Sequence, residues 1–361
     1  MARIGVNALY LIPGGVGGTE IYLRELLKGF AQIDAKNEYF VFTNLETGSD
    51  LTPRQANFLW KPQAVHARFR PARILWEQIV LPLEAARYRL DVLFSPGFTS
   101  PLLCGCPTVT VFHDLQHKRH PEYFRWFDLP FWRLLLWISA HRSRRLIAVS
   151  DATRADIQRY YRVSAERITV VRHGVDQQLF ALERSSGDPI LLCVSTLHPH
   201  KNLDRLIRAY ARKPRGLPLV IAGMQGFHAG RLDRLITELK LENRVQLTGW
   251  IPRDELYRLY ARARAFIYPS TFEGFGMPVL EAMAAGVPVA CSDIPPLREV
   301  ADDAALFFDP VNEEAIERAL DSISSDTSLR ERLSAEGRAR ARQFTWEKAA
   351  RETLDAILSV R

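Results

Sequence analysis

Short apolar runs that alternate with helix-like patterns limit the possible folds of this chain more than any other feature. The runs are continuously apolar, which is typical of strands buried on both faces of a parallel sheet. The alternation occurs twice in 361 residues, on either side of a polar, turn-rich stretch from Leu182 to Pro189 that we interpret as a linker. The sequence therefore predicts two α/β domains, a number that also suits the length.

The predicted strands share this apolar character and fall into two sets. In the first half they are Arg3–Ala8, Tyr39–Thr43, Val92–Ser95, Thr108–Phe112, Arg145–Val149 and Arg167–Val171. In the second half they are Ile190–Ser195, Leu219–Ala222, Val245–Thr248, Ala265–Tyr268, Val287–Ala290 and Ala305–Phe308. The last segment has helical spacing, with one apolar face made of Trp346, Ala350, Thr353, Leu354 and Ile357.

Several classes of protein do not fit this sequence. The longest apolar stretch, Phe131–Ala140, is interrupted by Arg133, whereas a membrane-spanning helix needs about 20 apolar residues. The first residues enter a strand pattern without the shape of a signal peptide. The four cysteines are too scattered for a disulfide framework. We therefore expect a cytoplasmic protein.

The positive charge is concentrated in the first half of the chain. The net charge is +7, and residues 51–76 hold five Lys and Arg with no acidic residue. Residues 118–145 hold seven Lys and Arg against two acidic residues, interleaved with aromatic side chains. This pattern favours an anionic partner, for which a membrane surface, a phosphorylated substrate and a nucleic acid are the candidates. No recognisable nucleic-acid motif accompanies it.

A glycine-rich turn follows the first predicted strand. Gly14, Gly15, Gly17 and Gly18 precede a helix pattern, so their amides and the helix N-terminus could form an anion cradle. No lysine follows as in a P-loop, and the third glycine of a dinucleotide fingerprint would fall at Glu20. The alternative interpretation is a flexible surface turn.

Candidate ligand-binding side chains follow two other predicted strands, where open α/β sheets bind ligands. Lys201 follows the first strand of the second half and could neutralise a diphosphate, although a solvated lysine is the usual alternative. His113 follows a strand of the first half, and a structural histidine is again the alternative. His117 and His120 lie nearby without the motif of a zinc site, so no metal is expected.

The most specific motif is the block from Pro269 to Pro288, which contains two glutamates. Pro278 suits the start of a helix and Gly286 suits the position after its end. Glu273 then lies in the preceding loop and Glu281 within the helix. Carboxylates for hydroxyls and loop amides for phosphate fit a nucleotide sugar, whereas a purely structural interpretation has both glutamates on the surface.

These motifs together resemble the retaining glycosyltransferases of family four, over nearly the whole chain. That family has the GT-B architecture, in which two Rossmann-like α/β domains face each other and a C-terminal helix crosses back to the first. The resemblance implies domains at 1–182 and 183–343, with a crossover helix at 344–361. Further matching segments are His113-Asp114, Val149-Ser150, His173–Asp176, Pro199–Asn202 and Leu247–Pro252.

The resemblance also implies the roles of individual residues. Catalytic roles fall on His113 beside the transferred sugar, Lys201 on the diphosphate and Glu273 on the sugar hydroxyls. Glu281 should hold the ribose hydroxyls. The remaining donor-binding positions are Gly14, Gly15, Gly17, Gly18, Ser150, Thr196, His200, Trp250, Ile251, Gly274, Phe275, Gly276 and Met277.

One departure from the family pattern affects the diphosphate site. Many members carry Gly-Arg where this chain has Ser195-Thr196, and a subgroup that resembles bacterial polysaccharide mannosyltransferases carries Arg where this chain has His200. The diphosphate would then rest on Lys201, with His200 as a pH-dependent substitute.

We expect a transferase that moves a hexose from a nucleoside diphosphate to a saccharide, with retention and without a metal cofactor. GDP-mannose is the expected donor, and the acceptor is a saccharide, free or linked to a polyprenyl diphosphate. The alternatives are a nucleotide-sugar epimerase on the same fold and a non-catalytic protein that binds nucleotides or nucleic acid. The aromatic and basic residues of the first half predict peripheral attachment to an anionic membrane surface, and no nucleic-acid partner is expected.

Overall fold

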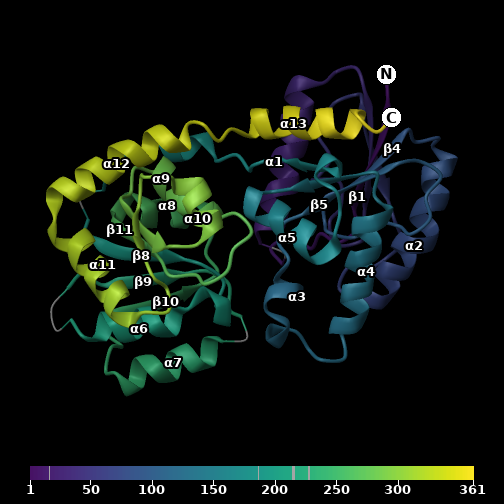
Figure 1. Cartoon of the computed structure of the whole chain (residues 1–361). Helices are drawn as coiled ribbons and strands as arrows, with labels where there is room; N and C mark the ends of the chain where they lie inside the picture. The colour runs from purple at the N-terminus through teal and green to yellow at the C-terminus, as the bar shows by residue number, and fades with distance from the viewer. Residues whose placement is uncertain (16, 186, 214–215, 227) are drawn as a thin grey trace. The chain divides into compact units, whose positions relative to one another are not determined.

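The computed structural model describes residues 1–361 except positions 16, 186, 214–215 and 227. Its contacts divide the chain into two compact units. Unit 1 contains Met1–Gly174 and Thr345–Arg361, and unit 2 contains Val175–Phe344. Each unit is a parallel sheet with helices around it (Figure 1). The predicted pair of Rossmann-like α/β domains is therefore confirmed.

Unit 1 is built on a seven-stranded sheet in the order β3-β2-β1-β4-β5-β6-β7. All of its strand pairs are parallel. Its strands are β1 (Arg3–Ala8), β2 (Glu38–Thr43), β3 (Phe58–Pro62), β4 (Val92–Ser95), β5 (Thr108–Phe112), β6 (Arg145–Ala148) and β7 (Ile168–Val170). Its α-helices are α1 (Gly18–Ile33), α2 (Arg70–Arg87), α3 (Gln116–Arg119), α4 (Leu129–Arg142), α5 (Asp151–Tyr161) and α13 (Trp346–Leu358).

Unit 2 is built on a six-stranded parallel sheet in the order β10-β9-β8-β11-β12-β13. Its strands are β8 (Ile190–Val194), β9 (Leu219–Ala222), β10 (Val245–Gly249), β11 (Ala263–Tyr268), β12 (Val289–Ser292) and β13 (Leu306–Phe308). Its α-helices are α6 (Leu203–Ala211), α7 (Ala229–Glu238), α8 (Arg253–Arg262), α9 (Met277–Ala284), α10 (Pro295–Ala301), α11 (Glu313–Ser325) and α12 (Thr327–Ala341).

The predicted strands agree closely with the observed ones, with one omission. β1, β4, β5 and β9 have the predicted bounds, and the others differ by one or two residues at their ends. The sequence did not predict β3, which lies at the edge of the sheet and has Phe58 as its one buried residue. Because the rest of β3 is half-buried or exposed, it lacks the continuous apolar run on which the prediction relied.

The first unit ends earlier in the chain than the predicted boundary after residue 182. Residues from Val175 onward belong to unit 2. In this segment Leu179 is fully buried, the Val175 amide donates to Phe344 O, and Arg338 donates to Phe180 O. The predicted linker contains Ser186, which lies outside the described residues.

The C-terminal helix α13 packs along α1 within unit 1 (Figure 1). Two glycines make this contact close. A Cβ on Gly29 would lie 2.6 Å from the Ala350 Cβ, and a Cβ on Gly174 would lie 2.2 Å from the Trp346 backbone nitrogen. The Trp346 ring stacks on His173, with 5.9 Å between ring centroids. The last helix therefore belongs to unit 1.

Two further sequence features can be located in this fold. Among the helices that the structure describes, none has the length and hydropathy required to cross a membrane. The cysteines are free thiols, with Cys104 and Cys106 in one loop and Cys193 and Cys291 buried in the sheet of unit 2.

Replacing Gly174 with alanine tests the packing of α13. The added methyl group would overlap the Trp346 backbone, and such overpacking costs about 1–3 kcal/mol. We expect the free energy of unfolding in guanidinium chloride to fall by that amount. The matched control is Gly105→Ala, because a Cβ there meets no atom within 4 Å. Equal stability of the two variants would contradict the described packing.

Candidate active site

The site residues of unit 2 gather at the point where its strand order reverses. From β8 the chain proceeds to β9 and β10 on one side, and then to β11, β12 and β13 on the other. The loops after β8 and β11 therefore leave the carboxyl edge side by side and diverge, which is where open α/β sheets bind ligands. Lys201 lies in the loop after β8 and Glu273 in the loop after β11.

Lys201 and Glu273 form an ion pair although they are far apart in sequence. The Lys201 Nζ lies 2.6 Å from Glu273 Oε1 and also donates to the Tyr268 hydroxyl, at 3.0 Å. The two side chains are only 12% and 11% exposed. The structure brings Lys201 and Glu273 into contact, while the expectation that Lys201, Glu273 and Glu281 line one cleft stays a prediction.

The ion pair determines the charge of Glu273. Burial alone would raise the pKa of Glu273, but the Lys201 charge and its hydrogen bond outweigh burial and hold that pKa below its ordinary value. Glu273 is therefore a carboxylate at neutral pH. The pair places a positive and a negative group at one mostly buried position, so it can donate to phosphate and accept from hydroxyl groups.

Hydrogen bonds to backbone carbonyls fix the loops after β8 and β11 against each other. Asn202 has a left-handed conformation with φ 58°, and its Nδ2 donates to Pro269 O at 3.0 Å and to Pro310 O at 2.7 Å. The His200 carbonyl accepts from the Thr271 amide at 2.8 Å. Because both contacts bridge the loops, Lys201 is held in place by its neighbours in the chain.

Glu281 belongs to a separate polar network on the same unit. Its Oε2 accepts a hydrogen bond of 3.1 Å from the Tyr260 hydroxyl. Burial raises the pKa of Glu281, while the nearby Arg253 charge and the Tyr260 hydrogen bond act to lower it. Arg253 is in turn paired with Asp176 at 2.6 Å.

Helix α9 begins immediately after the glycine-containing loop, as predicted. Gly276 precedes it with φ 118°, and a Cβ there would lie 2.5 Å from Leu297 Cδ2. Only glycine fits this position without strain. The turn places Gly274, Phe275 and Met277 at the N-terminus of the helix that carries Glu281.

The other predicted donor-binding residues of unit 2 also lie in loops at the carboxyl edge. Thr196 and His200 are half-buried in the loop after β8, where the His200 ring stacks on His198 with 5.8 Å between centroids. Trp250 and Ile251 follow β10, and Trp250 is 62% exposed. The structure does not bring Trp250 or Ile251 into a recorded side-chain contact with Lys201 or Glu273 among the described residues.

His113 lies at the carboxyl edge of unit 1, directly after β5. Its Nε2 is 2.8 Å from Pro96 O, and its ring meets Tyr22 edge to face. Burial lowers the pKa of His113 to about 4, so the imidazole is neutral at pH 7. Since a carbonyl can only accept, the proton is on Nε2 and the Nδ1 lone pair is left as an acceptor.

The glycine-rich turn differs from the predicted anion cradle. The Gly14 amide donates to Glu20 Oε2 at 2.8 Å, and the Gly15 amide donates to Ile12 O at 2.8 Å. These two amides therefore do not point to an open anion site in this conformation, because the carboxylate of Glu20 and the carbonyl of Ile12 accept from them. Gly17 and Gly18 border open space, and Val16 lies outside the described residues.

Ser150 has a structural role in this conformation. Its Oγ caps α5 by accepting from the Thr153 amide at 3.0 Å, and the residue is fully buried. Serine is a preferred N-cap because it satisfies an amide that the helix leaves unpaired. Its predicted contact with the donor stays a prediction.

Two cavities of unit 1 lie away from the predicted site residues. One of about 390 Å³ is lined by the Pro101–Thr108 loop and the end of α4, and one of about 800 Å³ by residues that include Arg24, Lys28 and Trp60. Among the described residues, no group of three or more His, Cys, Asp and Glu has the geometry of a metal site. His117 instead contacts the Tyr161 hydroxyl and His120 contacts Glu122.

Sequence reasoning missed the residues that complete the two networks of unit 2. Tyr268, Tyr260, Tyr257 and Arg253 all contact charged groups of the site. Tyr268 ends a predicted strand, which is a signal that could have identified it. Tyr257, Tyr260 and Arg253 belong to α8 and follow an ordinary helical pattern. Nothing in the sequence distinguishes them from surface residues.

Comparison with known proteins identifies two families along the chain. The family model described as Glycosyl transferases group 1 matches residues 175–340, and the one described as Glycosyltransferase Family 4 matches residues 16–179. The boundary between these matches falls close to the boundary between the two units.

Two relatives resemble about two thirds of the chain, and a solved structure shares its fold over nearly the whole length. O-antigen chain mannosyltransferase B of Escherichia coli is 34% identical over 263 residues, which is 69% of each chain. N-acetylgalactosamine-N,N'-diacetylbacillosaminyl-diphospho-undecaprenol 4-alpha-N-acetylgalactosaminyltransferase of Campylobacter jejuni is 31% identical over 233 residues, 63% of each chain. Sucrose-phosphate synthase from Thermosynechococcus elongatus superposes with a TM-score of 0.82 over 99% of each chain, at 19% identity, and shows the fold.

A double-mutant cycle tests the ion pair. Lys201→Met leaves a mostly buried carboxylate without its partner, which costs about 3–5 kcal/mol, and Glu273→Gln in the same chain should recover part of that loss. Because the pKa of Glu273 is lowered in the folded protein, the pair stabilises the fold above the pKa of the unfolded glutamate. That contribution is lost as the pH falls through the folded pKa.

The measurement is the free energy of unfolding of all four proteins at pH 7 and near pH 4 in guanidinium chloride. We expect the difference between wild type and Lys201→Met to shrink at the lower pH. Additive single-variant effects at pH 7 would show that the two side chains do not interact.

Proposed function

The chain belongs to glycosyltransferase family four and is a glycosyltransferase, and from this premise we propose that it transfers mannose from GDP-mannose, with retention, in bacterial cell-surface polysaccharide synthesis. The acceptor in this proposal is a saccharide linked to a polyprenyl diphosphate. The observation that carries the proposal is the Lys201–Glu273 pair at the switch point of unit 2.

Lys201 suits the leaving diphosphate. As the glycosidic bond breaks, negative charge develops on the diphosphate, and a fixed cation in a mostly buried position stabilises that charge without reorganisation. The N-terminus of α9 adds positive potential at the same edge. His200 directly precedes Lys201 and could add a second positive group when it is protonated.

The two glutamates suit the hydroxyl groups of the donor. Glu273 is an ionised acceptor held by Lys201, so it can accept from hydroxyls of the sugar. Glu281 keeps one oxygen on the Tyr260 hydroxyl and can accept from the ribose hydroxyls with the other. A site that pairs hydroxyl groups in this way rejects analogues that lack them, because its buried polar atoms would be left unpaired.

In the proposed reaction the residues of this chain bind the donor and stabilise the charge on the leaving diphosphate. A phosphate oxygen of the donor takes the proton of the acceptor hydroxyl. No metal is assigned a role, because Lys201 and the start of α9 can stabilise the diphosphate. In unit 1, the neutral His113 keeps its proton on Nε2 toward Pro96 and has an Nδ1 acceptor for a sugar hydroxyl.

The names of relatives support mannose as the sugar. O-antigen chain mannosyltransferase B shares more than a third of the aligned positions with this chain. A diphospho-undecaprenol acceptor stands in the name of the Campylobacter relative, which supports a lipid-linked acceptor here. The comparisons give no support to an epimerase or to a non-catalytic nucleotide-binding or nucleic-acid-binding protein.

An apolar face on unit 1 supports attachment to a membrane that carries such an acceptor. In helix α4, Leu135 and Leu136 are buried, whereas Phe131, Leu134 and Trp137 form an exposed apolar stripe. Helix α2 exposes another stripe at intervals of four residues. We define the apolar face as these two stripes with the adjoining loop residues: Leu75, Ile79, Leu83, Leu102, Leu103, Phe131, Leu134 and Trp137.

Hydrogen bonds and a cation–π contact join the parts of the apolar face. Gln78 of α2 accepts from the Leu102 amide at 2.8 Å, and Arg142 of α4 donates to Leu102 O at 3.2 Å. The Arg70 guanidinium lies over the Trp132 ring at 5.5 Å, so α2 and α4 are neighbours. Basic residues beside exposed apolar side chains favour an anionic bilayer surface, where each adds about 1 kcal/mol.

Turnover of nucleotide sugars tests the proposed reaction. Purified protein should transfer or hydrolyse GDP-mannose in preference to UDP-sugars. Lys201→Ala should lower kcat by about 10²–10³, the scale for removing one charge-stabilising group. Lys240→Ala is the control, because Lys240 is exposed and precedes β10 at the opposite edge of the sheet. Undiminished turnover in Lys201→Ala would refute this role for the ion pair.

Co-sedimentation with vesicles tests the apolar face. We expect wild-type protein to sediment with vesicles that contain phosphatidylglycerol at low salt and to be released in part at high salt, because surface charge attraction is screened. The double variant Ile79→Glu/Leu134→Glu should stay in the supernatant, and Val311→Glu, an exposed apolar position of unit 2, should sediment like wild type. Wild-type protein that stays in solution at low salt would remove the membrane from the proposal.

A further inference from the structure

Unit 1 has a switch point of its own, between β1 and β4. From β1 the chain proceeds to β2 and β3 on one side and then returns to β4, β5, β6 and β7 on the other. By the same rule that locates the ligand site of unit 2, the loops after β1 and β4 should flank a ligand site. These loops begin at Leu9 and Pro96, and α2 supplies buried polar residues beside them.

Glu77 of α2 connects the two sides of this switch point. The residue is only 1% exposed. Its Oε2 accepts from Asn7 Nδ2 of β1 at 3.1 Å and from Thr99 Oγ1 after β4 at 2.9 Å. The hydrogen bonds of Glu77 therefore fix α2 to strand β1 and to the loop after β4.

Arg73 lies one turn before Glu77 on the buried face of α2 and is only 6% exposed. Among the described residues, the structure records no ion pair and no side-chain hydrogen bond for its guanidinium group. The charge of Glu77 favours the Arg73 guanidinium and the charge of Arg70 opposes it. A guanidinium group carries five N–H donors, so Arg73 has donors to offer to a bound anion.

The position of Arg73 in the first turn of its helix also favours a bound anion. The first turn of α2 contains Arg70 and Arg73 and no acidic residue. Because the N-terminus of a helix is positive, cations there are unfavourable and an anion is favourable. One anion bound beside the first turn of α2 would satisfy both the guanidinium and the helix terminus.

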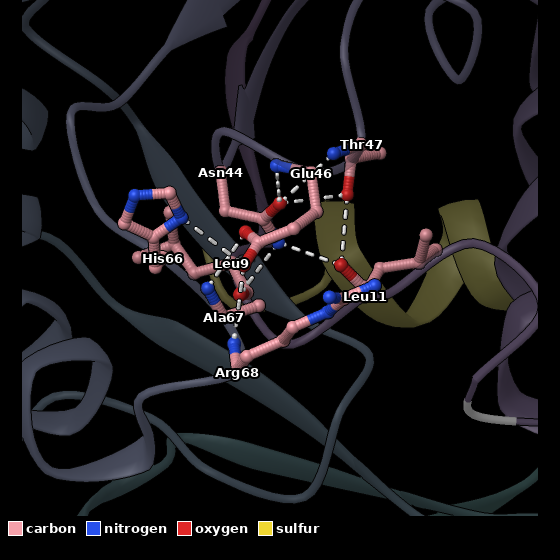
Figure 2. Close-up of polar contacts among 8 residues, drawn as sticks. All are labelled: Leu9, Leu11, Asn44, Glu46, Thr47, His66, Ala67 and Arg68. Carbon is pink, nitrogen blue, oxygen red and sulfur yellow. Dashed lines mark hydrogen bonds and ion pairs between the residues drawn. The ribbon is translucent and has the colours of Figure 1, made fainter.

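Polar contacts hold the segment just before α2 and the loop after β1 in place (Figure 2). Glu46 accepts from the Ala67 amide at 2.8 Å and the Arg68 amide at 3.4 Å, just before α2 begins. Asn44 Nδ2 donates to Leu9 O at 2.9 Å and Leu11 O at 2.6 Å, which fixes the loop after β1. The Tyr10 ring covers Gly97, where a Cβ would lie 2.3 Å from Tyr10 Cδ1.

We propose that Arg73 and the N-terminus of α2 bind a phosphate group of the acceptor at the switch point of unit 1. The inference rests on the proposed function, in which Lys201 of unit 2 takes the diphosphate of the donor. An arginine fork suits phosphate oxygens because it can donate two parallel hydrogen bonds. Glu20, in the first turn of α1 beside the glycine-rich turn, forms an ion pair with Arg24 at 2.8 Å and accepts a hydrogen bond from the Gly14 amide.

The test measures anion binding by the full-length protein with calorimetry. Saturating GDP first occupies the donor site, and the probes are inorganic pyrophosphate and farnesyl diphosphate, with farnesol as the uncharged control. Arg73→Gln should weaken both anions by about 10- to 100-fold, the scale of a lost hydrogen-bonded charge. Arg87→Gln, an exposed arginine at the other end of α2, should bind like wild type.

Each other outcome has a definite meaning. Unchanged anion affinity in Arg73→Gln would overturn the proposal and leave Arg73 a structural residue. A parallel loss of GDP affinity would also overturn it, because the anion would then be the diphosphate of the donor. If Arg73→Gln does not fold, Arg73→Lys keeps the charge without the planar fork and should still weaken both probes. Failure to turn over any nucleotide sugar would refute the proposed function separately, since pyrophosphate binding needs no reaction.

Discussion

The parallel arrangement of every strand pair constrains where this protein can place polar chemistry. The central strands are almost wholly apolar and buried, so the polar groups of the two sites come from the loops and helices at the carboxyl edges. In each unit the strand order reverses once, between β1 and β4 and between β8 and β11. The ion pair of unit 2 and the Arg73–Glu77 network of unit 1 both lie at these reversals.

The two networks use burial in different ways. Lys201 and Glu273 compensate each other at 2.6 Å, so the pair is stable without a ligand and each member can exchange its partner for a phosphate or a hydroxyl group. Arg73 has no such partner at hydrogen-bonding distance among the described residues, and Glu77 gives its Oε2 to Asn7 and Thr99. A buried cation that the fold satisfies only in part is expected at a functional site, where strain is tolerated.

Sequence reasoning recovered the architecture because a parallel sheet has a clear signature. Continuous apolar runs located β1, β4, β5 and β9 with their bounds, while the half-exposed edge strand β3 left no such run. The motifs singled out Lys201, Glu273 and Glu281 and the resemblance gave them roles, but neither could show that Lys201 bonds Glu273 or that Tyr268 completes the pair. The limit of sequence reasoning is clearest at Gly14. Its amide donates to the Glu20 carboxylate, a partner that the glycine pattern alone could not assign.

A crystal structure of the protein with GDP-mannose tests the central claim most directly. The account predicts the diphosphate within about 3 Å of Lys201 Nζ and the ribose hydroxyls hydrogen-bonded to the Glu281 carboxylate. It also predicts that the sugar hydroxyls contact Glu273. A nucleotide bound elsewhere on unit 2, with Lys201 still paired only to Glu273 and Tyr268, would contradict it.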